Sequence, residues 1–199
     1  CIRDRIMIEK LNIVVISIAA FLFGNLYAQS DKILLKGECN LDNVSLLTSF
    51  LNDRSNIEIS IKSSEGGESE FNNHAIIILC SNEYLKLSEL EIVNLQANIL
   101  NGSLLVIDNF NSDYTFSIFL KKILPEYSYS QYPLNLVLKN NPFKINFGNI
   151  NLNTRQIYLG EKLRILAIHD KSLLNEMNNE SLEHTKLLAT VIFNYLIGY

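Results

Sequence analysis

The fold class is decided by residues 75–107, which read AIIILCSNEYLKLSELEIVNLQANILNGSLLVI. Two apolar runs, 75–79 and 104–107, lie at the two ends of this stretch, and neither alternates with polar residues. Runs of this kind are typical of strands covered on both faces, as in a parallel sheet. Between them, Ser88 and Glu91 have the S-x-x-E spacing of a capping box, which opens a helix. The stretch therefore predicts a β-α-β unit with a right-handed crossover.

The helix predicted after Ser88 has an apolar face, which we expect to pack on the two strands. Gly102 follows it at the position where helices commonly end in a left-handed backbone conformation. The apolar face is predicted to consist of Ile92, Val93, Leu95, Ile99 and Leu100.

Shorter patterns upstream and downstream predict the remaining elements. Asp42 or Asn43 is expected to cap the first helix, and Pro125 to stop a later one. The strand at 57–61 alternates apolar and polar residues, which favours a place at or near a sheet edge. The predicted elements are a strand at 33–39, a helix at 43–51, the strand at 57–61, a helix at 113–124, an extended run at 134–138, a hairpin formed by 156–159 and 163–168, and a helix at 181–196.

Together these elements predict one three-layer α/β domain over residues 29–199, with a mostly parallel central sheet extended by a hairpin. Of the 199 residues, 48% are hydrophobic and 19% charged, which excludes an intrinsically disordered chain. A net charge of -4 argues against a nucleic-acid binder. The three His and three Cys show no metal-ligand spacing, so we expect no metal and no cofactor.

Residues 1–28 are predicted to comprise six upstream residues, 1–6, and a targeting segment that starts at Met7. Met7 and Lys10 precede an apolar run at 11–23, and Ala28 stands before Gln29 as a small cleavage-site residue. The run is shorter than the ~20 apolar residues of a membrane span, which favours a cleaved signal peptide; a retained anchor is the alternative. We therefore expect an exported protein, periplasmic or membrane-associated.

Two cysteines, Cys39 and Cys80, remain after the targeting segment. An oxidising compartment would allow a disulfide between them to persist. Two buried free thiols are the alternative.

Polar residues follow the two apolar strands at the place where ligands collect in open α/β sheets. Ser81 and Asn82 come after the first strand, and Asp108 and Asn109 after the second. Asp108 has the position to orient a ligand, to bind a cation or to cap the following turn. We expect these four residues to contribute to a ligand-binding site.

A catalytic interpretation depends on Cys80. A cysteine nucleophile needs a basic partner, for which His169 is the candidate, although no histidine stands at a spacing that implies such a pair. The residues around Cys80 also lack the small side chains of a nucleophile elbow. A structural cysteine is therefore favoured over a catalytic one.

The order of these motifs resembles the bacterial family called domain of unknown function 4159, whose members resemble the class I glutamine amidotransferase fold. The resemblance extends over residues 41–195. It implies a three-layer αβα sandwich with a glutamine amidotransferase-like or flavodoxin-like sheet, in an exported or membrane-associated domain used for binding or assembly. The segments that carry it are 76–79, 87–91, 101–109, 119–125, 140–143, 164–168 and 194–195.

The chain departs from this family at positions that matter for chemistry. Where the family has a Gly-His pair this chain has Ser81-Asn82, and where the family has His-Pro it has Asn141-Pro142. The paired Asp of the family is Asp108-Asn109 here, and its Gly-Gly is Asn101-Gly102. If the family histidines serve catalysis or metal binding, this chain has lost that chemistry. Asn141 joins the candidate ligand-binding residues on this resemblance.

The sequence thus favours a non-catalytic binding or assembly module over an amidotransferase-like or hydrolase-like enzyme that uses Cys80. Its expected partner is a protein in a membrane-associated complex or a small polar ligand, bound near Ser81, Asn82, Asp108, Asn109 and Asn141. A structural subunit that docks through an apolar patch at 127–133 is a third hypothesis. The oligomeric state is not predicted.

Overall fold

The two apolar runs of the β-α-β unit form neighbouring parallel strands in the middle of a six-stranded sheet. All five residues of β3 (Ile76–Cys80) are buried, and β4 (Leu104–Phe110) pairs with it from Ile76 opposite Leu104 to Cys80 opposite Asp108. The predicted central strands are therefore confirmed. The structure is a computed structural model that describes residues 32–54, 60–64, 71, 74–131, 138, 140–145, 152–175 and 181–197.

The strand order is β2-β1-β3-β4-β6-β5, and only the last pair is antiparallel. The chain moves outward from β1 to β2 and then returns to build β3, β4 and β6 on the other side, as in flavodoxin-like sheets. The topological switch point therefore lies between β1 and β3. The flanking strands are β1 (Lys32–Lys36), β2 (Ser60–Ser64), β5 (Asn153–Leu159) and β6 (Lys162–His169).

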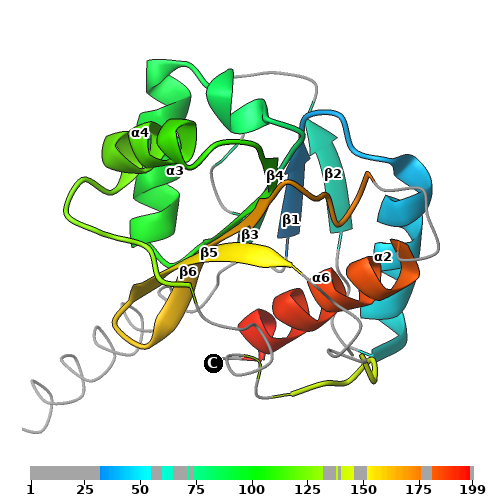
Figure 1. Cartoon of the computed structure of the whole chain (residues 1–199). Coiled ribbons are helices and arrows are strands. Elements are labelled where there is room, and N and C mark those ends of the chain that lie inside the picture. The colour runs from blue at the N-terminus through cyan, green and yellow to red at the C-terminus, as the bar shows by residue number, and fades with distance from the viewer. Residues whose placement is uncertain are drawn as a thin grey trace, which may run out of the picture. The chain divides into compact units, whose positions relative to one another are not determined.

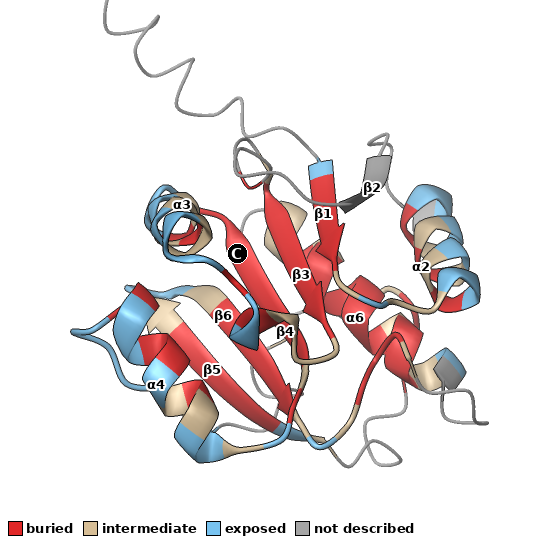
Figure 2. Ribbon diagram, turned by 90° about the horizontal axis from the view of Figure 1, so that it is seen from above, coloured by how far each residue is buried: buried red, intermediate tan, exposed pale blue. Residues whose placement is uncertain are grey.

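Helices cover both faces of this sheet and complete the three layers (Figure 1). On one face lie α2 (Leu41–Arg54) and α6 (Ser181–Leu196). On the other lie a 3-10 turn, η1 (Glu83–Leu85), and the helices α3 (Glu89–Leu100) and α4 (Asp113–Ile123). Figure 2 shows the buried strands between these helix layers. The predicted three-layer sandwich with a hairpin extension is confirmed.

The start of α2 differs from the prediction. The helix begins at Leu41 because Asn40 caps it: its side-chain oxygen accepts hydrogen bonds from the amides of Asp42 and Asn43, at 3.0 and 3.1 Å. The prediction that Asp42 or Asn43 is the cap is therefore wrong. Asn43 instead faces inward, where its Nδ2 donates to the Leu174 carbonyl at 2.7 Å.

In α3 the capping box is confirmed, but the apolar face is narrower than predicted. The Glu91 amide donates to Ser88 Oγ at 3.3 Å, and the Ser88 amide donates to Glu91 Oε2 at 2.8 Å. Leu95 and Ile99 are fully buried. The prediction is wrong for Val93 and Leu100, which point to solvent with 57% and 53% of their surface exposed.

Four predictions fall wholly or partly outside the described residues: the targeting segment at 1–28, the strand residues 57–59, residues 132–133 of the apolar patch and most of the extended run at 134–138. Residues 31–199 form one compact unit. Within the described ranges, no helix combines the length and the apolar character that a membrane crossing requires.

Candidate functional site

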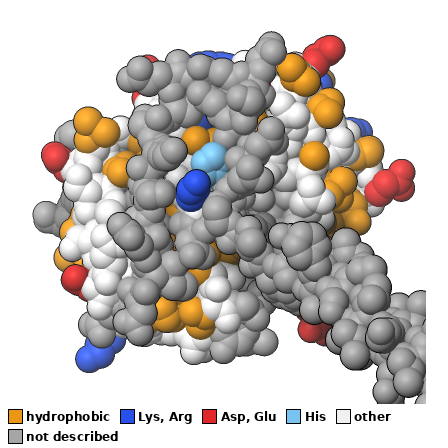
Figure 3. Space-filling model, turned by 180° about the vertical axis from the view of Figure 1, so that it is seen from behind, with side chains coloured by type: hydrophobic (Ala, Val, Ile, Leu, Met, Phe, Trp, Pro, Cys, Tyr) orange, Lys and Arg blue, Asp and Glu red, His pale blue; other side chains and the backbone are white. Residues whose placement is uncertain are grey.

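The carboxyl ends of β1, β3, β4 and β6 meet at one edge of the sheet, which we call the strand-end edge. This edge contains the switch point between β1 and β3, where open α/β sheets bind ligands. On the face shown in Figure 3, the charged side chains are scattered and form no patch of one sign among the described residues. We therefore place the candidate site at the strand-end edge. It comprises residues 37–40, 80–84, 108–113 and 169–175.

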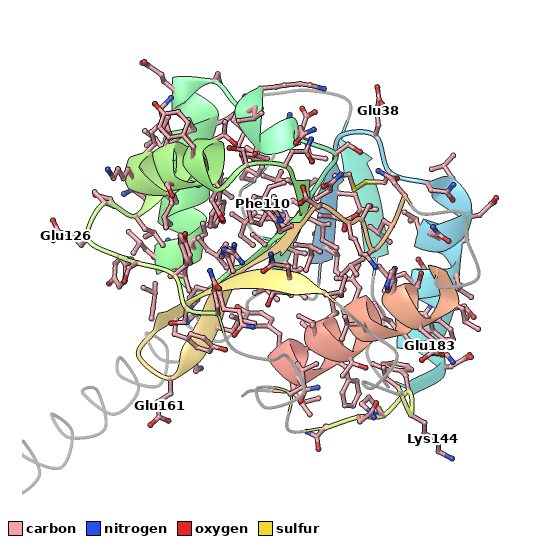
Figure 4. The ribbon with its side chains drawn as sticks, in the orientation of Figure 1. Glu38, Phe110, Glu126, Lys144, Glu161 and Glu183 are labelled. Atoms are coloured by element: carbon pink, nitrogen blue, oxygen red, sulfur yellow. A yellow bond between two sulfur atoms is a disulfide. The ribbon has the colours of Figure 1, made fainter. Side chains whose placement is uncertain are left out.

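A disulfide joins Cys39 to Cys80 across the switch point, with the two Cα atoms 5.5 Å apart. The sulfur–sulfur bond is drawn in yellow in Figure 4, near the end of β1. Of the two alternatives left open by the sequence, the structure has the disulfide. The nucleophilic form of cysteine is the thiolate, so Cys80 offers no nucleophile while it is bonded to Cys39.

Asp108 is fully buried beside Cys80 and binds the loop that follows β6. Its carboxylate accepts hydrogen bonds from Ser172 Oγ at 2.6 Å, from the Leu174 amide at 3.0 Å and from the Leu173 amide. The carboxylate thus stabilises the segment that leads toward α6.

A β-bulge next to Asp108 changes the face of the sheet to which Phe110 points. Ile107 pairs with Ala167 but Phe110 pairs with His169, so β4 holds one more residue than β6 over this interval. Asn109 is in the left-handed backbone region, with φ of 83°. Bulges re-aim side chains at sheet ends, and this bulge allows Asp108 and Phe110 to face opposite helix layers.

Asn175 ties the same loop to both sides of the disulfide. Its Nδ2 donates to the Glu38 carbonyl at 2.7 Å and to Ser81 Oγ at 2.6 Å, while its Oδ1 accepts from the Asn40 amide at 2.7 Å. Glu38 and Asn40 flank Cys39, and Ser81 follows Cys80. Asn175 was not predicted from the sequence, because a single asparagine in a loop carries no recognisable motif.

The backbone at the strand-end edge is unusually strained. Ser81, Asn82 and Asp170 adopt left-handed conformations, with φ of 45°, 48° and 57°, and Asn109 is the fourth such residue at this edge. Asn and Asp tolerate this region, whereas a serine there costs about 1 kcal/mol. Asn109 Oδ1 is also buried with no hydrogen-bond partner among the described residues. Strain of this kind concentrates at functional sites.

A second cluster surrounds Arg155. It lies at the part of the strand-end edge where β4 and β6 end. The nearly buried guanidinium makes two hydrogen bonds to Asp113, with Nε–Oδ1 at 2.9 Å and Nη2–Oδ2 at 2.8 Å. It also lies 5.9 Å from the centre of the Phe110 ring and 5.5 Å from that of Tyr129. Tyr129, from the apolar patch hypothesis at 127–133, is therefore partly covered inside the fold.

His169 is part of this second cluster and does not pair with Cys80. Its Nδ1 lies 2.9 Å from Asp170 Oδ2, and its ring packs edge-on against Phe110 at 4.7 Å. Phe110 belongs to the core on the α3 and α4 side of the sheet, whereas Cys80 belongs to the core on the α2 and α6 side. The structure therefore does not bring His169 to Cys80.

We expect the Asp113→Asn variant to lose less stability in acid than the wild type. The hydrogen bond from Arg155 is the largest cause that holds the pKa of Asp113 below its usual value of 3.8, while burial opposes this shift. A carboxylate with a lowered folded pKa stabilises the fold above its unfolded pKa, and that contribution is lost as the pH falls through the folded pKa. The side chain is 47% exposed, so we expect an effect below about 1 kcal/mol.

Urea unfolding at neutral pH and near pH 3 measures this difference. The control is Asp53→Asn, an exposed position on α2 across the sheet, which should keep the wild-type loss of free energy. Equal acid losses in the wild type and in Asp113→Asn would show that the ion pair contributes nothing.

Asn141 lies away from the strand-end edge. Its side chain binds the backbone of Ile145, and the neighbouring Asn140 pairs with Asn194 near the end of α6. The next residue on α6, Tyr195, contacts the carbonyl of Gly102, which precedes β4. Asn141 therefore lies toward the amino ends of the strands, and the structure does not group it with Ser81, Asn82, Asp108 and Asn109.

Among the described residues, no group of three or more His, Cys, Asp or Glu side chains is arranged to hold a metal ion. No protein-family model, curated protein or solved structure matches this chain. The resemblance to domain of unknown function 4159 therefore stays a prediction.

Proposed function

We propose that this chain is a non-catalytic binding module that recognises a partner protein through the outer surface of its strand-end edge. The observation that carries this proposal is that Cys80 and Asp108, the two residues of the edge best suited to catalysis, are already bonded to other parts of the fold. Cys80 is held in a disulfide and Asp108 accepts three hydrogen bonds inside the fold. Both residues stabilise the edge, which favours recognition over turnover.

The groups that face outward at this edge suit a protein surface. Asn82 is partly exposed and uncharged, and Asp170 is exposed. Ser81 and Asn109 are also partly exposed, although Ser81 Oγ is bonded to Asn175 and Asn109 Oδ1 is buried. The loop tied down by Asp108 and Asn175 covers the end of β4, which favours a partner that lies across the edge over a small polar ligand inserted into it. A rigid surface loses little conformational entropy on binding, which strengthens recognition by a few polar contacts.

The proposal includes export, to the periplasm or to a membrane-associated site. The disulfide supports it, because such bonds persist in oxidising compartments. The signal-like pattern of residues 1–28 points the same way. The family resemblance agrees with a binding role, since both family histidines are replaced, by Asn82 and Asn141.

A photo-crosslinking experiment tests the proposed surface. A benzophenone amino acid is placed at Asn111, an exposed position beside the edge, in cells that export the chain. The comparison position is Glu161 in the β5–β6 turn, which points away at the other end of the sheet (Figure 4). We expect one discrete crosslinked protein from position 111 and none from position 161. Equal capture from both positions, or none from position 111, would contradict the proposal.

Glycine variants then identify the recognition groups. Asn82→Gly and Asn109→Gly remove the amides but keep the left-handed backbone, which glycine adopts freely. Both should reduce the yield at position 111. The control is Lys144→Gly, which changes a left-handed residue outside the strand-end edge, and it should leave the yield unchanged.

A further inference from the structure

The outer face of α3 carries an apolar seam that is largely exposed in the described fold. Leu90, Val93 and Leu100 are 46%, 57% and 53% exposed, and Ala97 between them is also exposed. The four positions follow one another at intervals of three, four and three residues, the spacing of one stripe along a helix. We call Leu90, Val93, Ala97 and Leu100 the α3 seam.

The seam lies on the side of α3 opposite the residues that face the sheet. Leu95 and Ile99 are fully buried against the sheet, and at 3.6 residues per turn the seam residues fall about half a turn away from them. Figure 2 shows α3 at the outside of its layer. A surface helix normally has a polar outer face, so a helix that is apolar on both sides indicates a second packing partner.

We infer that the α3 seam pairs with the α3 seam of a second copy of this chain in an antiparallel, two-fold symmetric dimer. Such an interface is isologous, so one apolar seam supplies both halves. The inference is independent of the proposed strand-end surface.

The charges around the seam favour a second copy and select the antiparallel direction. The flanking residues Asn94, Gln96 and Asn101 are uncharged, so they do not repel their counterparts. Glu89 stands at the exposed amino end, and a parallel pair would place the two Glu89 carboxylates together, whereas an antiparallel pair separates them.

The antiparallel arrangement also adds an attraction at each end of the seam. Lys86 is exposed just before α3, and the last turn of α3 contains no basic residue. Each Glu89 carboxylate would then face the carbonyl end of the partner helix, and the nearby Lys86 ammonium supplies the cation that the helix dipole favours there. The charges at the two ends of the seam are therefore compatible with an antiparallel pair.

The size of the seam predicts a weak dimer. Four side chains on one helix fall short of the ~1,600 Å² that a stable interface buries. The neighbouring helix α4 also exposes apolar residues, Tyr114 at 75% and Ile118 at 42%. We expect dissociation in the micromolar to submillimolar range.

Sedimentation velocity of the exported protein over this concentration range tests the inference. The wild type should change from monomer to dimer, and Val93→Glu should raise the dissociation constant about tenfold or more, because it buries a charge in the seam. The control is Leu41→Glu, an equally drastic change at a 73% exposed leucine on the other side of the sheet, and it should dimerise like the wild type. A wild type that stays monomeric, or a Val93→Glu variant that dimerises normally, overturns the inference.

Engineered cysteines test the direction of pairing and do not depend on the glutamate variant. In an antiparallel seam, position 93 of one copy faces position 97 of the other. Oxidising a mixture of Val93→Cys and Ala97→Cys proteins should therefore crosslink position 93 to position 97. Crosslinking mainly between two copies of the same variant would overturn the antiparallel model. Neither result bears on partner capture at position 111.

Discussion

Replacing Asp108 with alanine is expected to lower the free energy of unfolding by about 3–5 kcal/mol. The carboxylate accepts hydrogen bonds from Ser172 Oγ and from the amides of Leu173 and Leu174, all of them buried. Each buried donor that loses its acceptor costs about 1–3 kcal/mol, and the serine hydroxyl is the only one of the three that can rotate to another acceptor. Urea unfolding measures the loss.

Two asparagine variants distinguish the effect of losing a buried carboxylate from the effect of losing an exposed one. Asp108→Asn places an amide against three donors and should lose roughly half of the alanine effect. Asp170→Asn makes the same change at an exposed residue of the same edge, keeps a side chain that tolerates the left-handed backbone and should shift stability by less than about 0.5 kcal/mol. If Asp108→Asn is as mild as Asp170→Asn, Asp108 does not hold the loop, and a ligand role for it regains support.

Removing the disulfide is expected to cost about 4 kcal/mol. The bond closes a loop with a sequence separation of 41 residues, and the chain-entropy model gives this magnitude for such a loop. The double variant Cys39→Ala with Cys80→Ala removes the bond without adding a polar group to the buried site of Cys80. Comparing its urea midpoint and slope with those of the oxidised wild type measures the change.

Reductant provides the control for this second prediction. Reducing the wild type breaks one sulfur–sulfur bond, yields two thiols and should cause a similar loss of stability. The double alanine variant should be insensitive to reductant. A wild type that reductant does not destabilise, or a variant destabilised to the same extent, would show that the bond contributes nothing.

The central β-α-β unit was predictable because its signals are local. Unbroken apolar runs identify β3 and β4, and the side chains of Ser88 and Glu91 interact within one helical turn. It was less predictable which apolar residues of α3 face the sheet and which face solvent. The sequence places Val93 and Leu100 in an apolar helix, but only the structure shows that they lie on the side of α3 that faces away from the sheet.

The interactions that close the strand-end edge were not predictable, because their partners are far apart in the chain. Asn175 binds Glu38 and Ser81 across separations of 137 and 94 residues, and Arg155 binds Asp113 across 42. The bulge at Asn109 depends on pairing with β6. The prediction that polar residues gather at the strand ends located the edge, but not the roles of the residues in it.

Asn141 shows the limit of carrying positions over from a resemblance. It was grouped with the strand-end residues only because the family has a histidine there. In the structure it organises its own turn through Ile145. A motif gives a residue's position in the sequence. Whether the residue lies at the carboxyl or the amino ends of the strands depends on the path of its loop.

Alkylation of the exported protein, followed by mass spectrometry, shows whether the thiol of Cys80 is free to react. We propose that the chemically capable groups at the strand-end edge are structural, and a catalytic alternative depends on Cys80. At neutral pH without reductant, we expect neither Cys39 nor Cys80 to be labelled, and both to be labelled after reduction and unfolding. Rapid labelling of Cys80 alone in the native, unreduced protein would rule out a structural disulfide and would support an enzyme that uses Cys80 as its nucleophile.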